Sequence, residues 1–540
     1  MSSIATGDEA EIRLLNDEDV VPGSVDFKGR PAVRPKTGCW KSSPFIIGGG
    51  VAERLSYYGI SSNLVSYLSG ALGQPTATAA AELNAWFGAS SLLPILGGFL
   101  ADSFTGRFRM IILSCLLYIS YLLVHKAKLP YSGIWDNVGV QGLSFLTLSA
   151  LLSSSSSRCK PAANTLGCSP PDQFQILFFF FSLYLVAIAQ GGLTPCLQAF
   201  GADQFEDEDE YELRLIDFRV NSTHVKNPFL RIYRVFIKAA KNWKAAAPVA
   251  ISTEEEAQGI LPQKSAQFRF LDKALLAPDG SINEKTCSVA DVEDAKSLLR
   301  LAPIWFACLG YSIIYAQPST LFTKQAATID RHITGGFQLP AASLQQCFIS
   351  VTITVSLVLY DRVFVPVARA ITNKPSGISK LQRIGTGLFL SSTSIVIAAF
   401  VERKRLALAS EYGLVDMPNA TIPMGVWWLA PQYVLSAASD VFAMVGLQEF
   451  FYDEVPSELK SIGLAMYLSI FGVGSLLSSF LVSSIQKLTS GKGQDGWFAN
   501  NLNRAHLDYF YLLLAGISAA GFAVFVCVNR SYVYRRRINI

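Results

Sequence analysis

The stretch QFQILFFFFSLYLVAIAQGGLTP, residues 173–195, decides the fold class of this chain. It contains no Asp, Glu, Lys or Arg, and about 20 apolar residues suffice for a helix to cross the hydrocarbon layer of a bilayer. The sequence therefore predicts an all-α polytopic membrane protein with about ten transmembrane helices, because runs of this kind lie near residues 44–69, 80–101, 108–125, 173–195, 299–322, 341–367, 382–401, 424–448, 460–485 and 507–529.

The composition agrees with a membrane protein and excludes several other classes. Of 540 residues, only 16% are charged and 51% are hydrophobic, whereas about 25% of a soluble chain is charged. The net charge of +4 is too small to suggest a nucleic-acid partner. Nine cysteines without a Cys-x-x-Cys pair and four histidines form no zinc or haem signature. We expect no metal, no cofactor and no enzymatic activity, since no loop carries a nucleophile with a base or a phosphate-binding motif.

The charges between the apolar runs predict the orientation. Residues 1–43 are polar and acidic and contain no signal peptide, so we expect a cytosolic N-terminal tail. An even number of spans returns the basic tail, residues 531–540, to the cytosol. Basic loops on the same side agree with the positive-inside rule, and the opposite loop 70–79 has no Lys or Arg. One loop disagrees, because Arg403, Lys404 and Arg405 would face outward.

A central segment, residues 201–298, has no spanning run and separates an N-terminal bundle (44–200) from a C-terminal bundle (299–530). Within it, apolar residues recur at helical spacing from Phe229 to Trp243, with Arg and Lys between them. This pattern predicts a basic amphipathic helix. Two placements remain open for that helix: on the inner leaflet of the membrane, or packed against the transmembrane bundle.

Ionisable residues inside the predicted spans are candidates for function, because charge within a bilayer is costly. Glu53 and Arg54 occupy the first span, either as a functional group or as a pair that neutralises itself. Asp440 has no partner within its own helix, which favours a position facing a cavity.

Six separated strings carry a family resemblance. In their order along the chain they are similar to the plant nitrate/peptide transporter family, which belongs to the proton-coupled oligopeptide transporters of the major facilitator superfamily. The resemblance implies two six-helix bundles related by an axis along the membrane normal, a substrate between them, and uptake coupled to protons. The strings are ERLSYYG (53–59), NAW (84–86), GADQF (201–205), YDRV (360–363), LQRIG (381–385) and GLQEFF (446–451).

The chain departs from this family in topology. No fifth or sixth span follows Phe205, so we expect ten helices, four before and six after the central segment. About 20 extra residues follow Ile119 within the third span and leave 142–152 too short to cross a membrane. An alternatively spliced or unspliced transcript would explain both changes.

The chain also departs in chemistry. Family members carry Glu-x-x-Glu-Arg in the first span, a lysine in the fourth, a nitrate-contacting histidine in the seventh, and in one relative a phosphorylated threonine. The corresponding residues here are Gly50, Thr194, Tyr315 and Met110. Glu53 and Arg54 remain as candidates for proton coupling. The side chains that we expect in a substrate cavity are Tyr57, Tyr58, Tyr315, Gln317, Ser319 and Asp440.

These observations predict a transporter of a small nitrogen-containing solute, nitrate or a di- or tripeptide. The alternative is a truncated paralogue or splice product without flux that senses substrate or partners a relative. The expected partners are membrane lipid, the small-molecule substrate and protons, and not nucleic acid. The expected location is the plasma or vacuolar membrane, and an approximate acidic dileucine signal over residues 9–15 favours the vacuole. Asn419-Ala420-Thr421 is an outward glycosylation sequon, whereas Asn221-Ser222-Thr223 would be cytosolic and silent.

Overall fold

The structure is a computed structural model of the full chain. The residues it describes are 20–25, 31–33, 39–70, 72–119, 173–202, 220–221, 228–243, 268–275, 287–334, 337–372, 378–455, 459–491 and 496–532. The expected insertion after Ile119 and most of the stretch that would lack two spans lie outside them.

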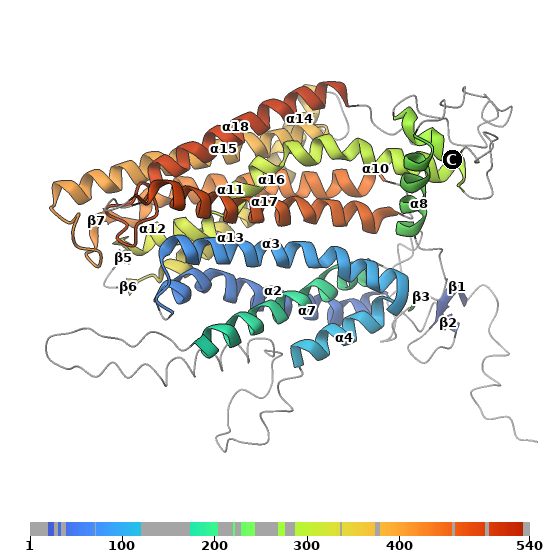
Figure 1. Ribbon diagram of the computed structural model, residues 1–540, viewed down its shortest axis with the longest axis horizontal. Coiled ribbons are helices and arrows are strands. Elements are labelled where there is room, and N and C mark those ends of the chain that lie inside the picture. The colour runs from blue at the N-terminus through green and yellow to red at the C-terminus, as the bar shows by residue number, and fades with distance from the viewer. Residues whose placement is uncertain are drawn as a thin grey trace, which may run out of the picture.

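Among the described residues, the first half of the transmembrane region forms four helices that pack side by side (Figure 1). A single π-helical turn, η2 (Ala101–Thr105), links the second to the third. The helices are α2 (Cys39–Gly70), α3 (Thr76–Leu100), α4 (Arg107–Ile119) and α7 (Gln173–Ala202).

The second half forms a bundle of six spans, three of which consist of more than one helical piece. The first is α10 (Val289–Ala307), α11 (Leu309–Tyr315), η4 (Pro318–Phe322) and α12 (Thr323–Ala327). The second is α13 (Ala341–Leu359), η5 (Tyr360–Phe364) and α14 (Val365–Thr372). The others are α15 (Lys380–Glu411), η6 (Val426–Leu429) with α16 (Ala430–Asp453), α17 (Lys460–Thr489) and α18 (Leu507–Ser531).

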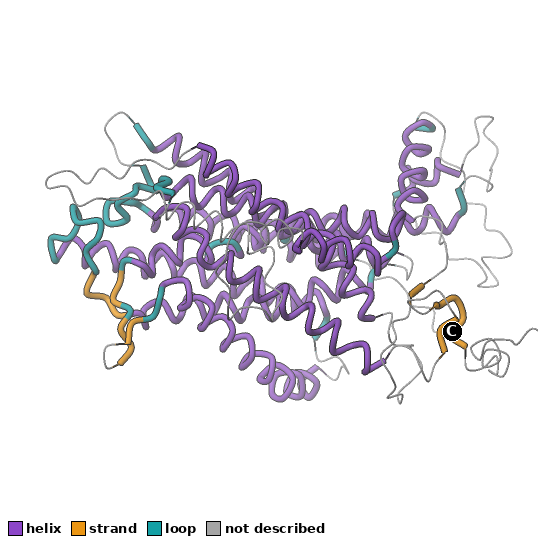
Figure 2. Tube along the Cα trace, turned by 90° about the horizontal axis from the view of Figure 1, so that it is seen from below, coloured by secondary structure: helices purple, strands orange, loops and turns teal. Residues whose placement is uncertain are grey.

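In the described part of the chain, short strands lie at the two ends of the helices (Figure 2). At one end, β1 (Val20–Val25) pairs antiparallel with β2 (Pro31–Val33) and β3 (Val220–Asn221). At the other end, β4 (Ile329–Asp330) pairs parallel with β7 (Ile422–Gly425), and β5 (His332–Thr334) pairs antiparallel with β6 (Phe337–Gln338).

Each of the ten predicted spans coincides with a helix. Among the described residues, seven helices are long and apolar enough to cross a membrane, or eight when α10 and the helix beyond its 52° bend count as one span. The other two predicted spans coincide with α2, which is long enough but too polar to be counted, and with α4, which is described only as far as Ile119. The residues that would complete α4 to 125 lie outside the described part.

The two bundles meet closely along α3 and α17. A Cβ atom added to Gly88 would lie 2.6 Å from Leu476 Cγ and 3.0 Å from the carbonyl oxygen of Gly472. Asn84 donates to Ser478 Oγ at 3.0 Å, and Ser479 donates to the carbonyl of Ala81 at 2.8 Å. Small residues and interhelical hydrogen bonds hold membrane helices together in this way. The two halves are therefore joined along α3, from its first turns to its middle.

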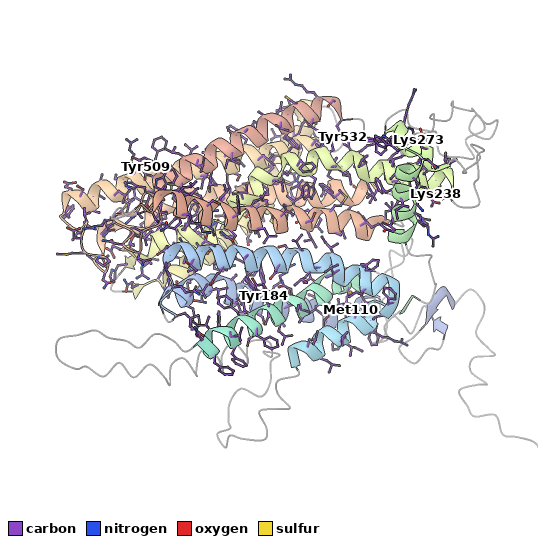
Figure 3. The ribbon with its side chains drawn as sticks, viewed as in Figure 1. Met110, Tyr184, Lys238, Lys273, Tyr509 and Tyr532 are labelled. Atoms are coloured by element: carbon purple, nitrogen blue, oxygen red, sulfur yellow. The ribbon has the colours of Figure 1, made fainter. Side chains whose placement is uncertain are left out.

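The amphipathic helix is α8 (Pro228–Lys241), and it crosses the end of the bundle (Figure 1). Its apolar residues Ile232 and Val235 are buried in one cluster with Leu271 of η3 (Arg269–Leu275) and Val292 of α10. Arg231 forms ion pairs of 3.3 and 3.2 Å with two aspartates of α10. Of the two open placements, the structure shows this apolar face packed against the protein. Lys238 points away from the transmembrane helices (Figure 3).

The three basic residues that disagreed with the charge rule lie in α15 and not in a loop, because this helix continues to Glu411. Arg405 and Glu402 are both fully buried, with 2.6 Å between Arg405 Nη2 and Glu402 Oε1. The Nζ atom of Lys404 lies 3.3 Å from the ring centroid of Trp428. Two of the three basic side chains are thus engaged in contacts within the protein, so this part of α15 is compatible with an outward position.

Candidate functional site

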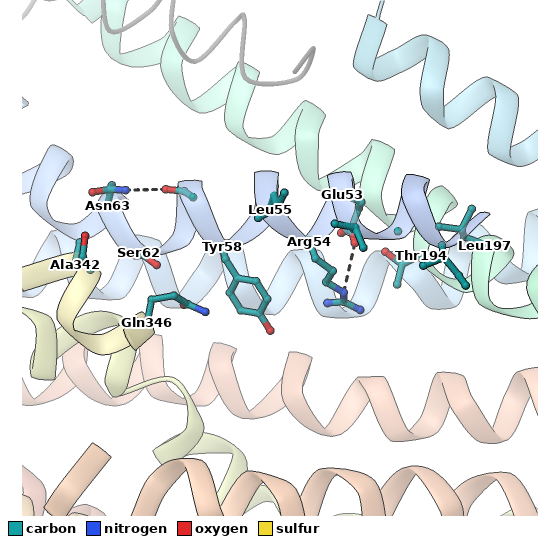
Figure 4. Close-up of a pocket in the computed structure, with 15 residues that line it drawn as sticks. Glu53, Arg54, Leu55, Tyr58, Ser62, Asn63, Thr194, Leu197, Ala342 and Gln346 are labelled. Atoms are coloured by element: carbon teal, nitrogen blue, oxygen red, sulfur yellow. Dashed lines mark hydrogen bonds and ion pairs between the residues drawn. The ribbon is translucent and has the colours of Figure 1, made fainter. Parts of the chain in front are cut away.

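A cavity of about 640 Å³ lies between α2, α7 and α13 (Figure 4). Most of its wall comes from one face of α2, because residues three and four apart on a helix share a face. The polar groups that line it are Glu53, Arg54, Tyr58, Ser62, Asn63, Thr194, Ser343 and Gln346.

Glu53 and Arg54 form an ion pair in this wall, with 3.5 Å between Glu53 Oε2 and Arg54 Nε. Only 4% of the Glu53 side chain is exposed, whereas 46% of the Arg54 side chain is. Glu53 Oε1 is buried without a hydrogen-bond partner among the described residues, although Gln190 of α7 is near. Because a guanidinium group stays charged, the exposed side of Arg54 can bind an anion.

A second polar group lies in the C-terminal bundle. Tyr311 of α11 donates a hydrogen bond of 2.8 Å to Asp440 Oδ1 of α16. Tyr315 packs edge-on against Phe471 of α17, with 5.0 Å between ring centroids. Tyr315 is close enough to Arg54 for an electrostatic interaction, and Asp440 is similarly close to Tyr58. Tyr315 and Asp440 are not among the residues that line the cavity, and the two polar groups approach each other through Tyr58 and Tyr315.

The structure brings some of the expected residues to the cavity and places others elsewhere. Glu53, Arg54 and Tyr58 line it, together with the replaced positions Gly50 and Thr194. Thr194 Oγ1 is buried without a hydrogen bond in the described part of the chain. A Cβ atom on Gly50 would lie 3.4 Å from Leu197 Cδ2, which is ordinary contact, so a larger side chain could start there.

The remaining candidates are engaged in packing. Tyr57 stacks on Trp86 at 5.4 Å between ring centroids. Gln317 is fully buried and donates to Ser478 Oγ at 3.1 Å, at the junction of α3 and α17. Ser319 accepts a hydrogen bond of 2.9 Å from Gln345. Met110 is buried in a small cluster with Ala101 and Cys196.

Two tyrosines of the second polar group were missed in the sequence. Tyr311 precedes Tyr315 by four residues and so shares its helix face, a spacing that could have identified it. Tyr467 of α17 lies within electrostatic range of Arg54 and Asp440. Nothing in its local sequence indicates this position, because only the packing of α17 brings it there. In the described ranges no three His, Cys, Asp or Glu side chains are grouped to hold a metal ion.

Comparison with known proteins identifies the family. The sequence model described as PTR2, POT family, matches residues 137–236 and 216–498. Protein NRT1/ PTR FAMILY 5.10 of Arabidopsis thaliana is 48% identical over 568 residues, covering 95% of this chain and 96% of that protein. The chain belongs to the POT family. Another POT-family relative, Protein NRT1/ PTR FAMILY 5.14 of the same plant, is 46% identical and covers 98% of this chain and 99% of its own.

Solved structures of the POT family show the same fold. An auto-inhibited POT family peptide transporter has a TM-score of 0.60 at 17% identity, covering 92% of this chain and 98% of its own. The POT family transporter PepTSo has a TM-score of 0.59 at 16% identity, covering 91% and 98%. The family and the major facilitator fold expected from the sequence are confirmed. The two stretches matched by the POT sequence model overlap over 216–236, just after the position where two spans are expected to be missing.

Proposed function

We propose that this POT-family protein carries nitrate or a di- or tripeptide through the cavity between its bundles, with protons as the driving ion. The observation that supports this most is the half-exposed Arg54 in the wall of the cavity. An arginine inside the membrane is costly unless it has a partner or water. A solute with an anionic group would provide that partner during transport.

Because Arg54 and Asp440 have opposite charges, the two candidate solutes, a peptide and nitrate, should depend on them differently. A short peptide is a zwitterion, and its carboxylate and amino group match in charge the Arg54 guanidinium in the cavity wall and the Asp440 carboxylate of the other bundle. Nitrate has only negative charge and needs Arg54 alone. A peptide substrate would therefore depend on both residues, and nitrate on one.

Glu53 and Asp440 are the proposed proton carriers. The Glu53 side chain is almost fully buried beside Arg54. Asp440 accepts a hydrogen bond from Tyr311 and forms no ion pair with any described residue. A buried carboxylate without a cation is unfavourable, and binding a proton or a cationic solute removes that penalty. Loss of the family's second carboxylate at Gly50 leaves these two to exchange protons.

A second candidate function is a protein without flux that senses substrate or partners a full-length relative. One observation favours it: in the most apolar window of the span Ala341–Ile371, none of the residues is buried. On α2, Val51 and Leu55 are 53% and 70% exposed. Both helices thus present uncovered apolar faces beside the cavity, as expected where the fifth and sixth spans are missing.

Uptake of labelled nitrate and labelled dipeptide into oocytes at acidic and neutral pH tests these proposals. Transport predicts uptake above that of uninjected oocytes, and proton coupling predicts more uptake at acidic pH. Arg54→Gln should abolish it, whereas Arg300→Gln, outside the cavity lining, should not. Uptake that does not vary with pH would refute proton coupling but keep transport. No uptake despite surface expression would favour the sensor or partner.

The proposed location is the plasma or vacuolar membrane, where lipid surrounds the exposed apolar faces. A fluorescent fusion of the full chain in plant cells distinguishes the two. If the dileucine-like segment directs the protein to the vacuole, replacing Leu14 and Leu15 with alanine should move it to the cell surface.

A further inference from the structure

The turn between α15 and β7 carries a glycosylation sequon, Asn419-Ala420-Thr421, on the surface of the molecule. Both Asn419 and Thr421 are exposed. Within the described part of the chain, the amide of Asn419 makes no hydrogen bond, whereas the neighbouring backbone is bonded through Ala420 N–H to the carbonyl of Met417 at 3.2 Å. The acceptor side chain is therefore free to enter the site of a transferase.

This turn is held in place by contacts on both sides of the sequon. Asn501 donates to the carbonyl of Val415 at 2.8 Å, and Asn503 donates to that of Met417 at 3.2 Å. After the sequon, the N–H of Ile422 donates to the carbonyl of Thr328 at 2.9 Å. Because the flanking backbone is fixed and the three sequon residues lie between these anchors, the asparagine is presented on a defined outer edge.

The sequon also stands clear of the membrane. The apolar run of α15 ends near residue 401, but the helix continues to Glu411. At 1.5 Å per residue this adds about 15 Å beyond the apolar part. Trp427 and Trp428, 60% and 48% exposed, follow at the start of the next span, and exposed tryptophans of this kind mark the membrane interface. A transferase at the membrane surface needs such a spacing to reach its acceptor.

The expected orientation of the chain places this turn on the outer side of the membrane, as N-glycosylation requires. The end of α15 and β7 lie at the opposite end of the molecule from α8 (Figure 1). The basic residues that argued for a cytosolic position of this loop are partly neutralised, since Arg405 pairs with Glu402 and Lys404 lies on Trp428. Short cytosolic loops are the basic ones, so this end faces the lumen during synthesis and the exterior or vacuolar lumen afterwards.

We propose that Asn419 is an N-glycosylation site of this protein. Its amide nitrogen displaces the diphosphate from C1 of an oligosaccharide carried on a polyprenyl diphosphate. The new bond is N–C, the broken bond is C1–O, the polyprenyl diphosphate leaves, and the amide loses one proton. The Thr421 hydroxyl completes the recognition sequence.

The chain supplies its own controls. Two further sequons, Asn221-Ser222-Thr223 and Asn529-Arg530-Ser531, lie at the opposite end: Asn221 is in β3, and Asn529 is in the last turn of α18. If the orientation is as described, both are cytosolic and stay unmodified. The three sequons therefore test the site and the orientation of the chain together.

The experiment expresses the full chain in oocytes and treats membranes with peptide N-glycosidase before gel electrophoresis. The wild type should migrate faster after treatment. Asn419→Gln and Thr421→Ala should migrate like the treated wild type and not respond, whereas Thr421→Ser, Asn221→Gln and Asn529→Gln should behave as wild type. Thr421→Ser keeps the hydroxyl, so it separates loss of the sequon from a disturbed turn. An untreated wild type without a glycan, or a shift that persists in Asn419→Gln, would overturn the proposal.

Discussion

Replacing Arg405 with methionine should destabilise the outer end of the C-terminal bundle more than any other single change near it. Arg405 is fully buried and donates to Glu402 Oε1 at 2.6 Å, Glu402 Oε2 at 2.9 Å, Asn503 Oδ1 at 2.9 Å and the carbonyl of Leu502 at 2.7 Å. These bonds join α15 to the loop before α18. Their loss leaves Glu402 as a buried carboxylate without its cation.

The size of the expected destabilisation follows from the groups that remain buried in the Arg405→Met variant. Removing one partner of a buried ion pair costs about 3–5 kcal/mol, because the other charge is left uncompensated. Glu402 keeps one hydrogen bond, of 2.8 Å from Gln325, which offsets a small part of this cost. Replacing both partners with apolar side chains of similar volume should be far milder, since no buried charge then remains. We therefore expect Arg405→Met to be much less stable than the double variant Glu402→Leu/Arg405→Met.

The assay is thermal unfolding in detergent, followed by the fraction of protein that stays monodisperse on size exclusion. Arg403→Met, on an exposed side chain of the same helix and without the buried pair, is the matched control and should unfold at the wild-type temperature. The reasoning is refuted if the double variant is as unstable as Arg405→Met, because the cost would then come from lost packing and hydrogen bonds and not from the unpaired carboxylate.

Three further predictions concern the bundle junction and the cavity. Gly88→Leu places side-chain atoms where Leu476 already lies 2.6 Å from the added Cβ. Because overpacking of this kind costs about 1–3 kcal/mol, we expect lower thermal stability and less uptake. Wild-type stability and uptake would contradict the close contact. Gly50→Glu restores a second carboxylate and should steepen the rise of uptake at acidic pH. The control Gly48→Glu, whose Cβ meets nothing within 4 Å, should not change this pH dependence. Equal effects of the two substitutions would argue against a role for the cavity position. Asp440→Asn should lower dipeptide uptake by about 10-fold or more, because one charge-assisted bond of about 1.5–3 kcal/mol is lost. Nitrate uptake should stay unchanged. Loss of both dipeptide and nitrate uptake would indicate a structural role for Asp440.

Much of the fold could be predicted from local sequence. A spanning helix is selected by the bilayer, which requires a long apolar run whatever its neighbours are, so all ten helices were visible as runs. The amphipathic helix was visible for a related reason, since the spacing of its apolar residues records a single buried face. Which surface buries that face was not visible, because the partners Leu271 and Val292 are distant in sequence.

The site could be predicted only in part. Glu53, Arg54 and Asp440 were found because charge within a span is unusual in itself. Gln317 was expected in the cavity, but it is buried and donates a hydrogen bond to Ser478 instead. Packing between the bundles decides which face of this helix is buried. Tyr467 was missed for the same reason: a tyrosine in an apolar run has no signal until its neighbours are known.

The sequence by itself determined that this chain is a helical membrane protein of the POT family, where its spans lie, and which carboxylates and cation enter the membrane. These properties follow from the local cost of placing each residue in hydrocarbon. The tertiary structure decided which of these groups line the cavity, how Gly88 and Gly472 let the bundles meet, and how Arg405 is buried against Glu402. Those properties depend on distances between residues far apart in the chain, and only packing sets such distances.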